Sequence, residues 1–596
     1  MSSAATIETI EPGASTILQD PATVNYTNSV ISLILIFLAY HYYANFYSYF
    51  KRRGITGPTP YPLVGNLPSL LSSNRMKVER DWTERYGKFY GMFQGLRPVF
   101  VVNDPEVFRQ ICIKDFDAMP NHEASAFLND YQKEFIFLLQ DDKWKRTRAL
   151  QSPTFTSGKI KRMFKLLDIC ADDLVMCFSE HLQDAKQQQQ QLTKTIVNLK
   201  DIYSLFTMDA ITSAGYAIKL NRKGSTNMKT AASRDDFVRI ALKFFEPNFK
   251  RIFVALTGPK WFLKLINFKV SDGSTMKPII DRLQPVIEQR RNSPKRFEDY
   301  LQILVDARLD DRMELDEMDE KENHHAGLTE SSLQSDQAKM LNDISANGSS
   351  NGSSNGHSEK AKTNGSVNGA SPAAQSADGF KLNDFEILSS AVFLLLVGLE
   401  TTATLLTNCT YALAFHPDIQ QRLYEVIKSI AEFNNETGGY SFDYDKLTSC
   451  EYLDAVISET LRNLAPVLTI DRLVSRDYYI EKYNVHLKKG DKLHLAYYAV
   501  MNNPEYWPDP LKFDPERFMG DNKKKIVPGS YCPFGLGPRH CLGMRFSLTE
   551  TKLALAKVLM KFKFTHAPGT HFPPTQKRRL NLNTFQTPLV EMAART

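Results

Sequence analysis

Two long apolar runs interrupt a chain whose hydrophobic positions otherwise follow mixed helical and strand periods. The first runs from Val30 to Phe50, about 21 residues, and is rich in tyrosine and phenylalanine towards its end. This length spans one bilayer as a helix, and tyrosines suit the membrane interface. Lys51, Arg52 and Arg53 follow directly and should remain cytosolic. The pattern favours an uncleaved membrane anchor. The alternatives are a buried core helix and a signal peptide, but in a signal peptide the basic cluster would precede the apolar run.

The second apolar run, Leu382 to Leu406, has the length of another membrane span. It contains an acid and two hydroxyls near its middle, which are costly in lipid, so it predicts the central helix of a soluble domain. Phe393, Val397, Glu400 and Thr401 fall near one face of that helix. A salt bridge is the simpler interpretation of Glu400, and a hydrogen bond within its own helix is the simpler one of Thr401.

Helical periods dominate the rest of the chain, with a few short strands. Phe89–Phe93 and Pro98–Val102 flank Gly95 as a β-hairpin, and Asp104-Pro105 then opens a long, mostly helical stretch that ends near residue 310. A helix is predicted at Tyr452–Leu464, followed by strands near Tyr478–Val485 and Lys492–Tyr497. The fold class predicted is mainly α with smaller β-sheets.

Composition shifts divide the chain into segments. Residues 1–29 form a short polar N-terminus, 30–50 the anchor, and 51–66 a basic and proline-rich hinge that is too rich in proline for helix or sheet. Residues 67–596 form one large domain. Within it, about 310–378 changes from acidic clusters to Asn-Gly-Ser repeats, a composition that cannot build a packed core and predicts a disordered insertion.

Charge and cysteine usage exclude several classes of protein. The 596 residues carry a net charge of +6 without a dense basic stripe, which argues against a nucleic-acid partner. The seven cysteines are scattered and include no C-x-x-C pair. This pattern argues against a disulfide framework or a zinc site and favours a reducing compartment.

The most informative stretch is Pro533–Gly543, Pro-Phe-Gly-Leu-Gly-Pro-Arg-His-Cys-Leu-Gly. Its glycines and proline predict a compact loop that presents Cys541 just before an amphipathic helix, Met544–Phe562. A cysteine at a helix N-terminus is favoured as thiolate, the form that binds iron. Arg539 offers a permanent cation to a carboxylate, and Gly543 lets a flat ligand approach the backbone. A buried structural cysteine is the simpler interpretation of Cys541 alone.

Two further pairs have spacings that place their side chains on one helix face. Trp144 and Arg148 are four residues apart, and Glu459 and Arg462 are three apart between apolar neighbours. Surface packing and surface ion pairs are the common explanations of such spacings. Three basic residues lie beside the first pair: Lys143, Lys145 and Arg146. They are expected to form either a basic surface that docks a partner or an ordinary solvent-exposed surface.

Four motifs occur in one order: Gly-x-Glu-Thr-Thr at 398–402, Glu-x-x-Arg at 459–462, Pro-Glu-Arg-Phe at 515–518 and Phe-x-x-Gly-x-Arg-x-Cys-x-Gly at 534–543. With this ordered set, the chain resembles a microsomal cytochrome P-450, a haem-thiolate mono-oxygenase. The resemblance extends from the anchor to the C-terminus, apart from residues 1–29 and the insertion. Segments 57–60, 144–148, 152–159 and 544–546 are most similar to the 3A and thromboxane-synthase branch.

The resemblance implies a cytochrome P-450 fold and haem b as the cofactor, with Cys541 as the axial metal ligand. It also implies that the haem propionates are bound by Trp144, Arg148, Arg472 and Arg539. Glu400 and Thr401 would relay protons to dioxygen, and Glu459, Arg462 and Arg517 would form a buried ion network that braces the cysteine loop. Val397 departs from the family, which usually has a small residue before this glycine.

The activity implied is insertion of one oxygen atom from O2 into a lipophilic substrate such as a sterol, fatty acid or xenobiotic. NADPH-cytochrome P-450 reductase would supply electrons, with cytochrome b5 as a further candidate donor, to a cytosolic domain anchored by one span in the endoplasmic reticulum membrane. An isomerase that rearranges a lipid peroxide without O2 or reductase is the alternative, and a non-catalytic haem sensor is a third. An apolar pocket is expected from Phe127, Phe135, Phe393, Leu396, Val397 and Val467–Thr469.

Overall fold

The computed structural model describes residues 21–123, 127–188, 194–218, 236–246, 248–258, 260–271, 273–306, 308–309, 380–434, 438–577, 582–586 and 588–595. The predicted insertion at about 310–378 lies outside the described residues. The chain divides into two units, Met1–Thr56 and Gly57–Thr596.

The first unit contains helices α1 (Pro21–Tyr47) and α2 (Tyr49–Arg52). Within α1, Asn28–Tyr47 is long and apolar enough to cross a membrane, and none of its candidate span is buried. In the second unit, α18 (Asp384–Phe415) meets the same test of length and composition, but 72% of its apolar window is buried. The prediction that this second apolar run is a core helix is therefore confirmed.

The second unit is mainly helical, as predicted. Besides α18, its longer helices are α4 (Arg75–Tyr86), α7 (Asp141–Gln151), α8 (Ser157–Gln188), α9 (Leu199–Tyr216), α11 (Asp236–Phe244), α12 (Phe249–Thr257), α14 (Lys277–Asn292), α19 (Pro417–Ile430), α21 (Glu451–Asn463) and α24 (Met544–Lys561). Shorter helices are α3 (Leu67–Leu70), α5 (Pro105–Arg109), α6 (Asp130–Lys133), α13 (Lys260–Leu265), α15 (Tyr300–Asp306), α20 (Tyr444–Thr448), α22 (Tyr497–Met501) and α23 (Gly520–Lys524).

A four-stranded sheet in the order β1-β2-β11-β8 contains β1 (Phe89–Gln94), β2 (Arg97–Val102), β11 (Lys492–Leu495) and β8 (Ile470–Leu473). The β1–β2 hairpin agrees with the prediction, whereas Tyr497, expected at the end of a strand, begins α22. A second sheet, β12-β13-β3, joins β12 (Phe562–His566), β13 (Leu589–Ala594) and β3 (Lys194–Asn198). Two-stranded pairs are β4 (Arg308–Leu309) with β5 (Phe380–Lys381), β6 (Ala431–Asn434) with β7 (Gly439–Phe442), and β9 (Tyr478–Ile480) with β10 (Val485–Leu487).

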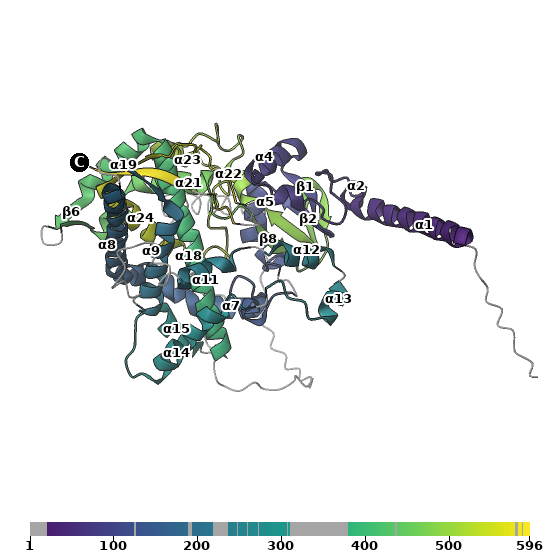
Figure 1. Ribbon diagram of the computed structural model, residues 1–596, viewed down its shortest axis with the longest axis horizontal. Coiled ribbons are helices and arrows are strands. Elements are labelled where there is room, and N and C mark those ends of the chain that lie inside the picture. Colours follow the sequence, from purple (N-terminus) through teal and green to yellow (C-terminus); the bar gives the residue numbers. More distant parts are fainter. Residues whose placement is uncertain are drawn as a thin grey trace, which may run out of the picture. The chain divides into compact units, whose positions relative to one another are not determined.

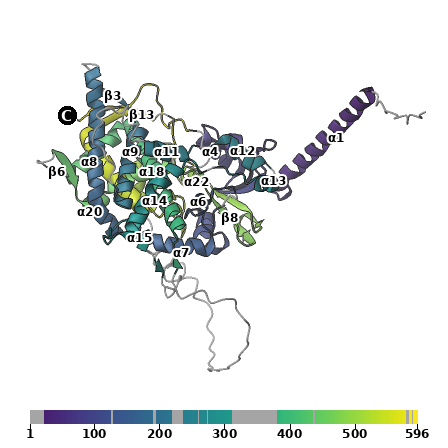
Figure 2. The same cartoon turned by 60° about the horizontal axis from the view of Figure 1, so that its bottom comes forward.

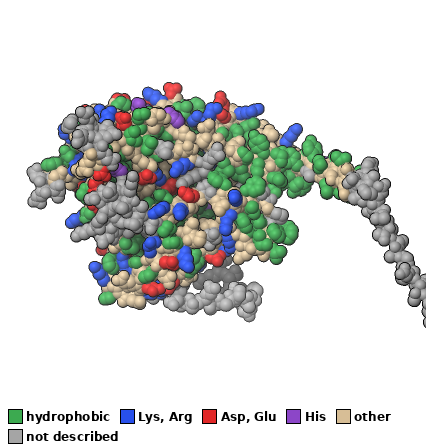
Figure 3. Space-filling model, viewed as in Figure 1, with side chains coloured by type: hydrophobic (Ala, Val, Ile, Leu, Met, Phe, Trp, Pro, Cys, Tyr) green, Lys and Arg blue, Asp and Glu red, His purple; other side chains and the backbone are tan. Residues whose placement is uncertain are grey.

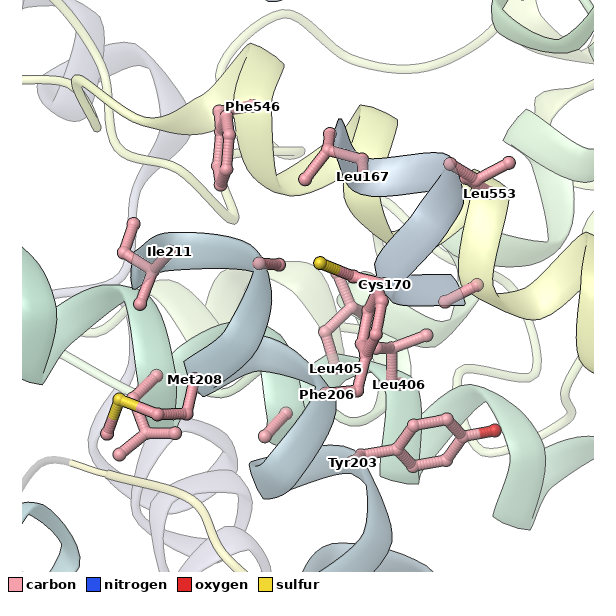
Figure 4. Packing of buried hydrophobic residues seen from close by; sticks show 14 of the residues in the cluster. Leu167, Cys170, Tyr203, Phe206, Met208, Ile211, Leu405, Leu406, Phe546 and Leu553 are labelled. Carbon is pink, nitrogen blue, oxygen red and sulfur yellow. The ribbon is translucent and has the colours of Figure 1, made fainter. Parts of the chain in front are cut away.

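Helix α18 runs through the middle of this unit, between the four-stranded sheet on one side and α8 and β6 on the other (Figures 1 and 2). Its first turn is fixed by a capping box, in which Asn383 and Glu386 each bind the other's backbone N–H. Leu405 and Leu406 of α18 pack with Tyr203 and Phe206 of α9, and α8 and α24 complete this core (Figure 4).

Helices α12 and α13 present a group of large apolar side chains to solvent. Trp261 is 71% and Leu265 75% exposed, and Phe249, Phe253, Phe262 and Ile266 are each more than 40% exposed. Hydrophobic side chains gather at the place of these two helices in the space-filling view (Figure 3). A patch of this kind is typical of a surface that meets another apolar phase or partner.

Candidate active site

The predicted cysteine loop is closed by its own backbone. The N–H of Cys541 donates to the carbonyl of Phe534 at 2.8 Å, and Gly535 and Gly537 take the positive φ angles of 85° and 69° that favour glycine. A Cβ on Gly537 would lie 1.8 Å from the carbonyl oxygen of Cys112, so no other residue fits there without moving the backbone. The glycines therefore determine the conformation of the loop and allow it to pack closely against the backbone at Cys112.

Cys541 lies three residues before the first residue of α24 and faces a cavity, so its side chain is exposed although the loop is packed into the domain. Burial raises the pKa of this thiol, and the Gly543 N–H and the charge of Arg148 lower it by less. The backbone effect thus has the direction expected at a helix N-terminus, but burial outweighs it. A bound cation would be needed to hold the sulfur as thiolate.

The cavity lies between the Cys541 loop and α18. Phe393, Val397 and Thr401, spaced one turn apart, line it together with Leu394 and Gly398. The other lining residues that we use below are His122, Phe137, Trp144, Arg148, Ile211, Val467, Arg539 and Ser547. Of the residues that were expected in an apolar pocket, Phe393, Val397 and Val467 line the cavity. The others are not in its lining: Phe127, Phe135, Leu396, Leu468 and Thr469.

Three buried arginines, Arg148, Arg472 and Arg539, lie close to one another, and Arg148 and Arg539 line the cavity. Arg539 donates to the carbonyls of Pro120 and Leu139, both at 2.8 Å, and Arg148 donates to the carbonyl of His540 at 3.1 Å. Arg539 also lies over the ring of Trp144. Burial, followed by the charges of Arg472 and Arg148, lowers the pKa of Arg539 to about 8, although Asp141 opposes this shift.

Such a surplus of buried positive charge is suited to an anionic ligand. Haem carries two carboxylates, so the charge of this site is one measure of whether haem fits it. Two carboxylates beside Arg539 and Arg148 would relieve the repulsion that depresses the pKa of Arg539. Arg472 Nε is also buried without a hydrogen-bond partner in the described part of the chain. Apart from its own chain neighbours, no described residue places an atom within 4 Å of where a Cβ on Gly543 would be, so the space beside this cavity-lining glycine is open to a flat ligand. The residues present therefore fit a flat cofactor that carries two carboxylates, as haem does.

His122 belongs to this cluster and was missed by sequence reasoning. It is 2% exposed, stacks on Phe137 with ring centroids 4.1 Å apart, and lies 3.1 Å from Arg472 Nη1. Burial, and then the charge of Arg472, lowers the pKa of His122 to about 4, although Asp471 raises it. Arg472 thus faces His122 and is not among the described residues that line the cavity. A lone histidine in a loop gives no signal that a sequence could reveal.

Glu400 and Thr401, the predicted proton relay, differ in position. Thr401 lines the cavity, and its hydroxyl donates to the carbonyl of Val397 at 2.7 Å. The carboxylate of Glu400 is buried and pairs with Lys200 of α9 at 3.2 Å. Both of the simpler interpretations, an internal hydrogen bond and a salt bridge, thus describe contacts that exist. The catalytic roles of the two residues stay predictions.

The expected Glu-x-x-Arg network forms. Glu459 and Arg462 are fully buried and make a two-pronged pair, Nε to Oε2 at 2.7 Å and Nη2 to Oε1 at 2.8 Å. Glu459 also accepts from the N–H of Asp514, and Arg517 lies 3.5 Å away. Arg462 stacks against Trp507, whose indole N–H donates to Ser530, three residues before the cysteine loop. The network therefore supports the approach to the loop.

Lys143 is 41% exposed, but its ammonium group is paired within the chain, with Glu134 at 2.6 Å and with Glu386, at the start of α18, at 2.9 Å. The second contact joins α7, which also carries Trp144 and Arg148, to α18. For Lys143 the structure favours an intramolecular role.

The comparisons with known proteins agree with this site. The cytochrome P450 family model matches residues 55–343 and 353–590. Cytochrome P450 3A5 of Homo sapiens is 30% identical over 545 residues, which cover 91% of each chain. Cytochrome P450 3A11 of Mus musculus is 30% identical over 554 residues, which cover 91% of this chain and 92% of the relative. The chain therefore belongs to the cytochrome P450 family, which implies a haem-thiolate oxidoreductase.

Proposed function

We propose that the protein is a mono-oxygenase that inserts one oxygen atom from O2 into a lipophilic substrate, with electrons that originate from NADPH. The observation that carries this proposal is a single cavity whose lining includes Cys541 together with Phe393, Val397 and Thr401 of α18. Haem bound through the thiolate supplies oxygen activation, because an anionic sulfur donates electron density that favours O–O cleavage.

Each predicted residue has a role that its position supports. Cys541 would bind the iron, and Trp144, Arg148 and Arg539 would hold the propionates through the charge surplus at their end of the cavity. Arg472, behind His122, would add to that positive potential. Thr401 would move a proton at its hydroxyl, which already lies in the cavity, and Glu400 would replenish it.

The apolar part of the cavity lining favours an apolar substrate. Ile211, Phe393, Leu394, Val397 and Val467 offer only hydrocarbon surface there. Binding would therefore be driven by burial of apolar surface, as in most small-molecule sites. Sterols, fatty acids and xenobiotics are the substrate classes that fit this lining.

We propose the endoplasmic reticulum membrane as the location, with residues 1–29 in the lumen, 30–50 as anchor, 51–66 as hinge and 67–596 as the cytosolic catalytic domain. The apolar length of α1 supports a span, and the exposed apolar side chains of α12 and α13 support contact of the catalytic domain with lipid. A cytosolic domain could receive electrons from NADPH-cytochrome P-450 reductase, with cytochrome b5 as a further donor.

One observation favours the alternative of a peroxide isomerase. Glu400 pairs with Lys200 and is not among the described residues that line the cavity, and an isomerase needs no proton relay. Turnover of a lipid endoperoxide by purified protein without NADPH or reductase would select this alternative.

The test of the proposed function has two arms. Full-length protein, reduced and treated with carbon monoxide, should show the Soret band of a thiolate ligand, and Cys541→Ala should lose it while remaining folded. Reconstituted with reductase, NADPH and a panel of steroids, fatty acids and drugs, the wild type should consume O2 and form a hydroxylated product. A thiolate spectrum without any reductase-dependent product would refute the mono-oxygenase assignment.

A further inference from the structure

The contact of Glu400 with Lys200 occurs on the seam between α9 and α18. The Nζ of Lys200 lies 3.2 Å from Glu400 Oε2, and it also donates to the Glu400 carbonyl at 3.0 Å and to Thr404 Oγ1 at 2.8 Å. One ammonium group thus holds the carboxylate, a main-chain carbonyl and a hydroxyl within a single turn of α18. This is a far more specific arrangement than a surface ion pair.

The same seam holds the backbone of α18 at the turn before Glu400. Thr207 of α9 donates to the Leu399 carbonyl at 3.2 Å, and Thr401 donates to the Val397 carbonyl at 2.7 Å. A Cβ on Gly398 would lie 3.0 Å from Ile211 of α9, so glycine allows this close approach. The helix segment that carries Glu400 and Thr401 is therefore fixed from the α9 side.

The pair has an inner and an outer member. The Glu400 side chain is 1% exposed and that of Lys200 17% exposed, so water reaches the lysine and not the acid. Lys200 is the second residue of α9, next to Asp201, where the chain enters the helix from β3. The lysine thus lies between bulk water and a buried acid whose sequence neighbour, Thr401, opens into the cavity.

From this geometry we infer that Lys200 is the positioning residue for proton delivery: it holds Glu400 on the α9 side of α18 and connects it to solvent. The inference rests on the proposed function, since it assigns a control element to the same reaction. When the ion pair opens, water that enters at Lys200 relays a proton from bulk solvent to Glu400, and Glu400 passes it to Thr401 Oγ. Thr401 releases its own hydroxyl proton into the cavity, so one proton enters and one leaves, and both side chains return to their starting charge.

The test compares Lys200→Met, which removes the cation, with Lys200→Arg, which keeps it. Lys200→Gln is the second neutral variant, since its amide can still donate to the Glu400 carbonyl if the methionine variant folds poorly. Lys557→Met is the matched control. Lys557 is 3% exposed and pairs with Asp168 at 2.7 Å and Asp172 at 2.5 Å, between α24 and α8, so Lys557→Met removes a buried ammonium group and its ion pairs elsewhere in the domain.

Two readouts are needed. In reconstituted holoenzyme, the neutral Lys200 variants should lower the product formed per NADPH by about ten-fold. A positioned acid or base contributes roughly 10²-fold or more to a rate, and we expect the loss of Lys200 to remove part of that contribution. The neutral variants should also enlarge the solvent deuterium isotope effect, and Lys200→Arg should restore most of the loss. In resting protein without turnover, the infrared band that Glu400→Gln removes should shift in the neutral variants and return towards the wild-type position in Lys200→Arg.

The outcomes are separable. Unchanged coupling and an unchanged infrared band in Lys200→Met or Lys200→Gln would overturn the inference, as would an equal loss of coupling in Lys557→Met. If the wild type showed no reductase-dependent product, the proposed function would fail. The infrared arm would then still decide whether Lys200 positions Glu400, because it requires no turnover.

Discussion

The guanidinium carbon of Arg539 lies 4.0 Å over the ring centre of Trp144, which joins the cysteine loop to α7 across almost 400 residues of chain. The arginine is held in this place by carbonyls of Pro120 and Leu139 and by the amide oxygen of Asn121. These neutral acceptors, a longer contact to the Ile136 carbonyl and the aromatic face fix the orientation of Arg539 without neutralising its charge. The cation is thus prepared for a carboxylate before any ligand arrives.

Arg539→Lys should weaken haem binding without unfolding the domain, because an ammonium group keeps the charge but loses the planar fork and the stacking on Trp144. Loss of hydrogen bonds to a charged group costs about 1.5–3 kcal/mol, so haem should dissociate roughly ten- to hundred-fold more readily. Haem transfer to apomyoglobin, followed by absorbance, measures this. Arg545→Lys, on the first turn of α24, is the control, and equal haem loss in both variants would contradict the assigned role.

Two glycines of the cysteine loop should respond differently to alanine. In Gly537→Ala the new Cβ meets the Cys112 carbonyl at 1.8 Å at a φ of 69°, so the loop must shift and the thermal unfolding midpoint should fall. In Gly543→Ala, φ is −88° and no described residue beyond the chain neighbours has an atom within 4 Å of the new Cβ, so the chain should fold normally. The methyl group would instead occupy space needed by the haem, so haem content should fall. Normal haem content in Gly543→Ala would place the haem elsewhere.

The buried pair of Glu459 and Arg462 should contribute to the free energy of unfolding and not to the chemistry. Glu459→Gln leaves a fully buried arginine without its counter-charge, and such a loss costs about 3–5 kcal/mol. The exposed pair of Arg422 and Glu516 is the control, since Glu516→Gln should cost at most about 1 kcal/mol. Urea unfolding followed by circular dichroism measures both changes. A similar small change in the two variants would show that the network is dispensable.

Sequence patterns predicted α18, the β1–β2 hairpin and the cysteine loop because each depends on local rules: an apolar run for α18, and glycines at the turns of the hairpin and the loop. The start of α18 at Asp384 could be read only once Asn383 and Glu386 were seen to cap it. Contacts between residues far apart in the chain could not be predicted from the sequence. Nothing near Lys200 or His122 in the sequence indicates that the first pairs with Glu400 or that the second stacks beside Arg472, since the packing of α9 on α18 and of a loop on β8 creates both contacts.

His122 should make the haem-free protein sensitive to acid. Its pKa is about 4 in the folded chain and 6.5 without perturbation, so between these values the unfolded chain binds a proton that the folded chain does not. The contribution of His122 to the free energy of unfolding is therefore largest above pH 6.5, falls as the pH drops towards 4, and is absent below pH 4. Its total size is at most about 3 kcal/mol. Urea unfolding at pH 7 and pH 4.5 should show a smaller acid loss in His122→Gln than in wild type. An equal loss would mean that other groups set the acid limit.

Thr401 and Thr407 make the same kind of hydrogen bond at different places on α18, which allows a strict comparison. The hydroxyl of Thr401 donates to the Val397 carbonyl at 2.7 Å and that of Thr407 to the Ala403 carbonyl at 2.6 Å, but only Thr401 lines the cavity. Valine keeps the branched shape and removes the hydroxyl in either position.

Thr401→Val should therefore retain haem and the thiolate spectrum while coupled turnover falls about 10²-fold and the electrons appear as hydrogen peroxide, because no positioned hydroxyl delivers the proton. Thr407→Val loses the same internal hydrogen bond, so any effect of helix geometry alone should appear there too. Product and peroxide formed per NADPH measure the partition. Equal coupling in the two variants would remove Thr401 from proton delivery and would favour the isomerase, in which the cavity needs its apolar shape and its cysteine but no proton donor on α18.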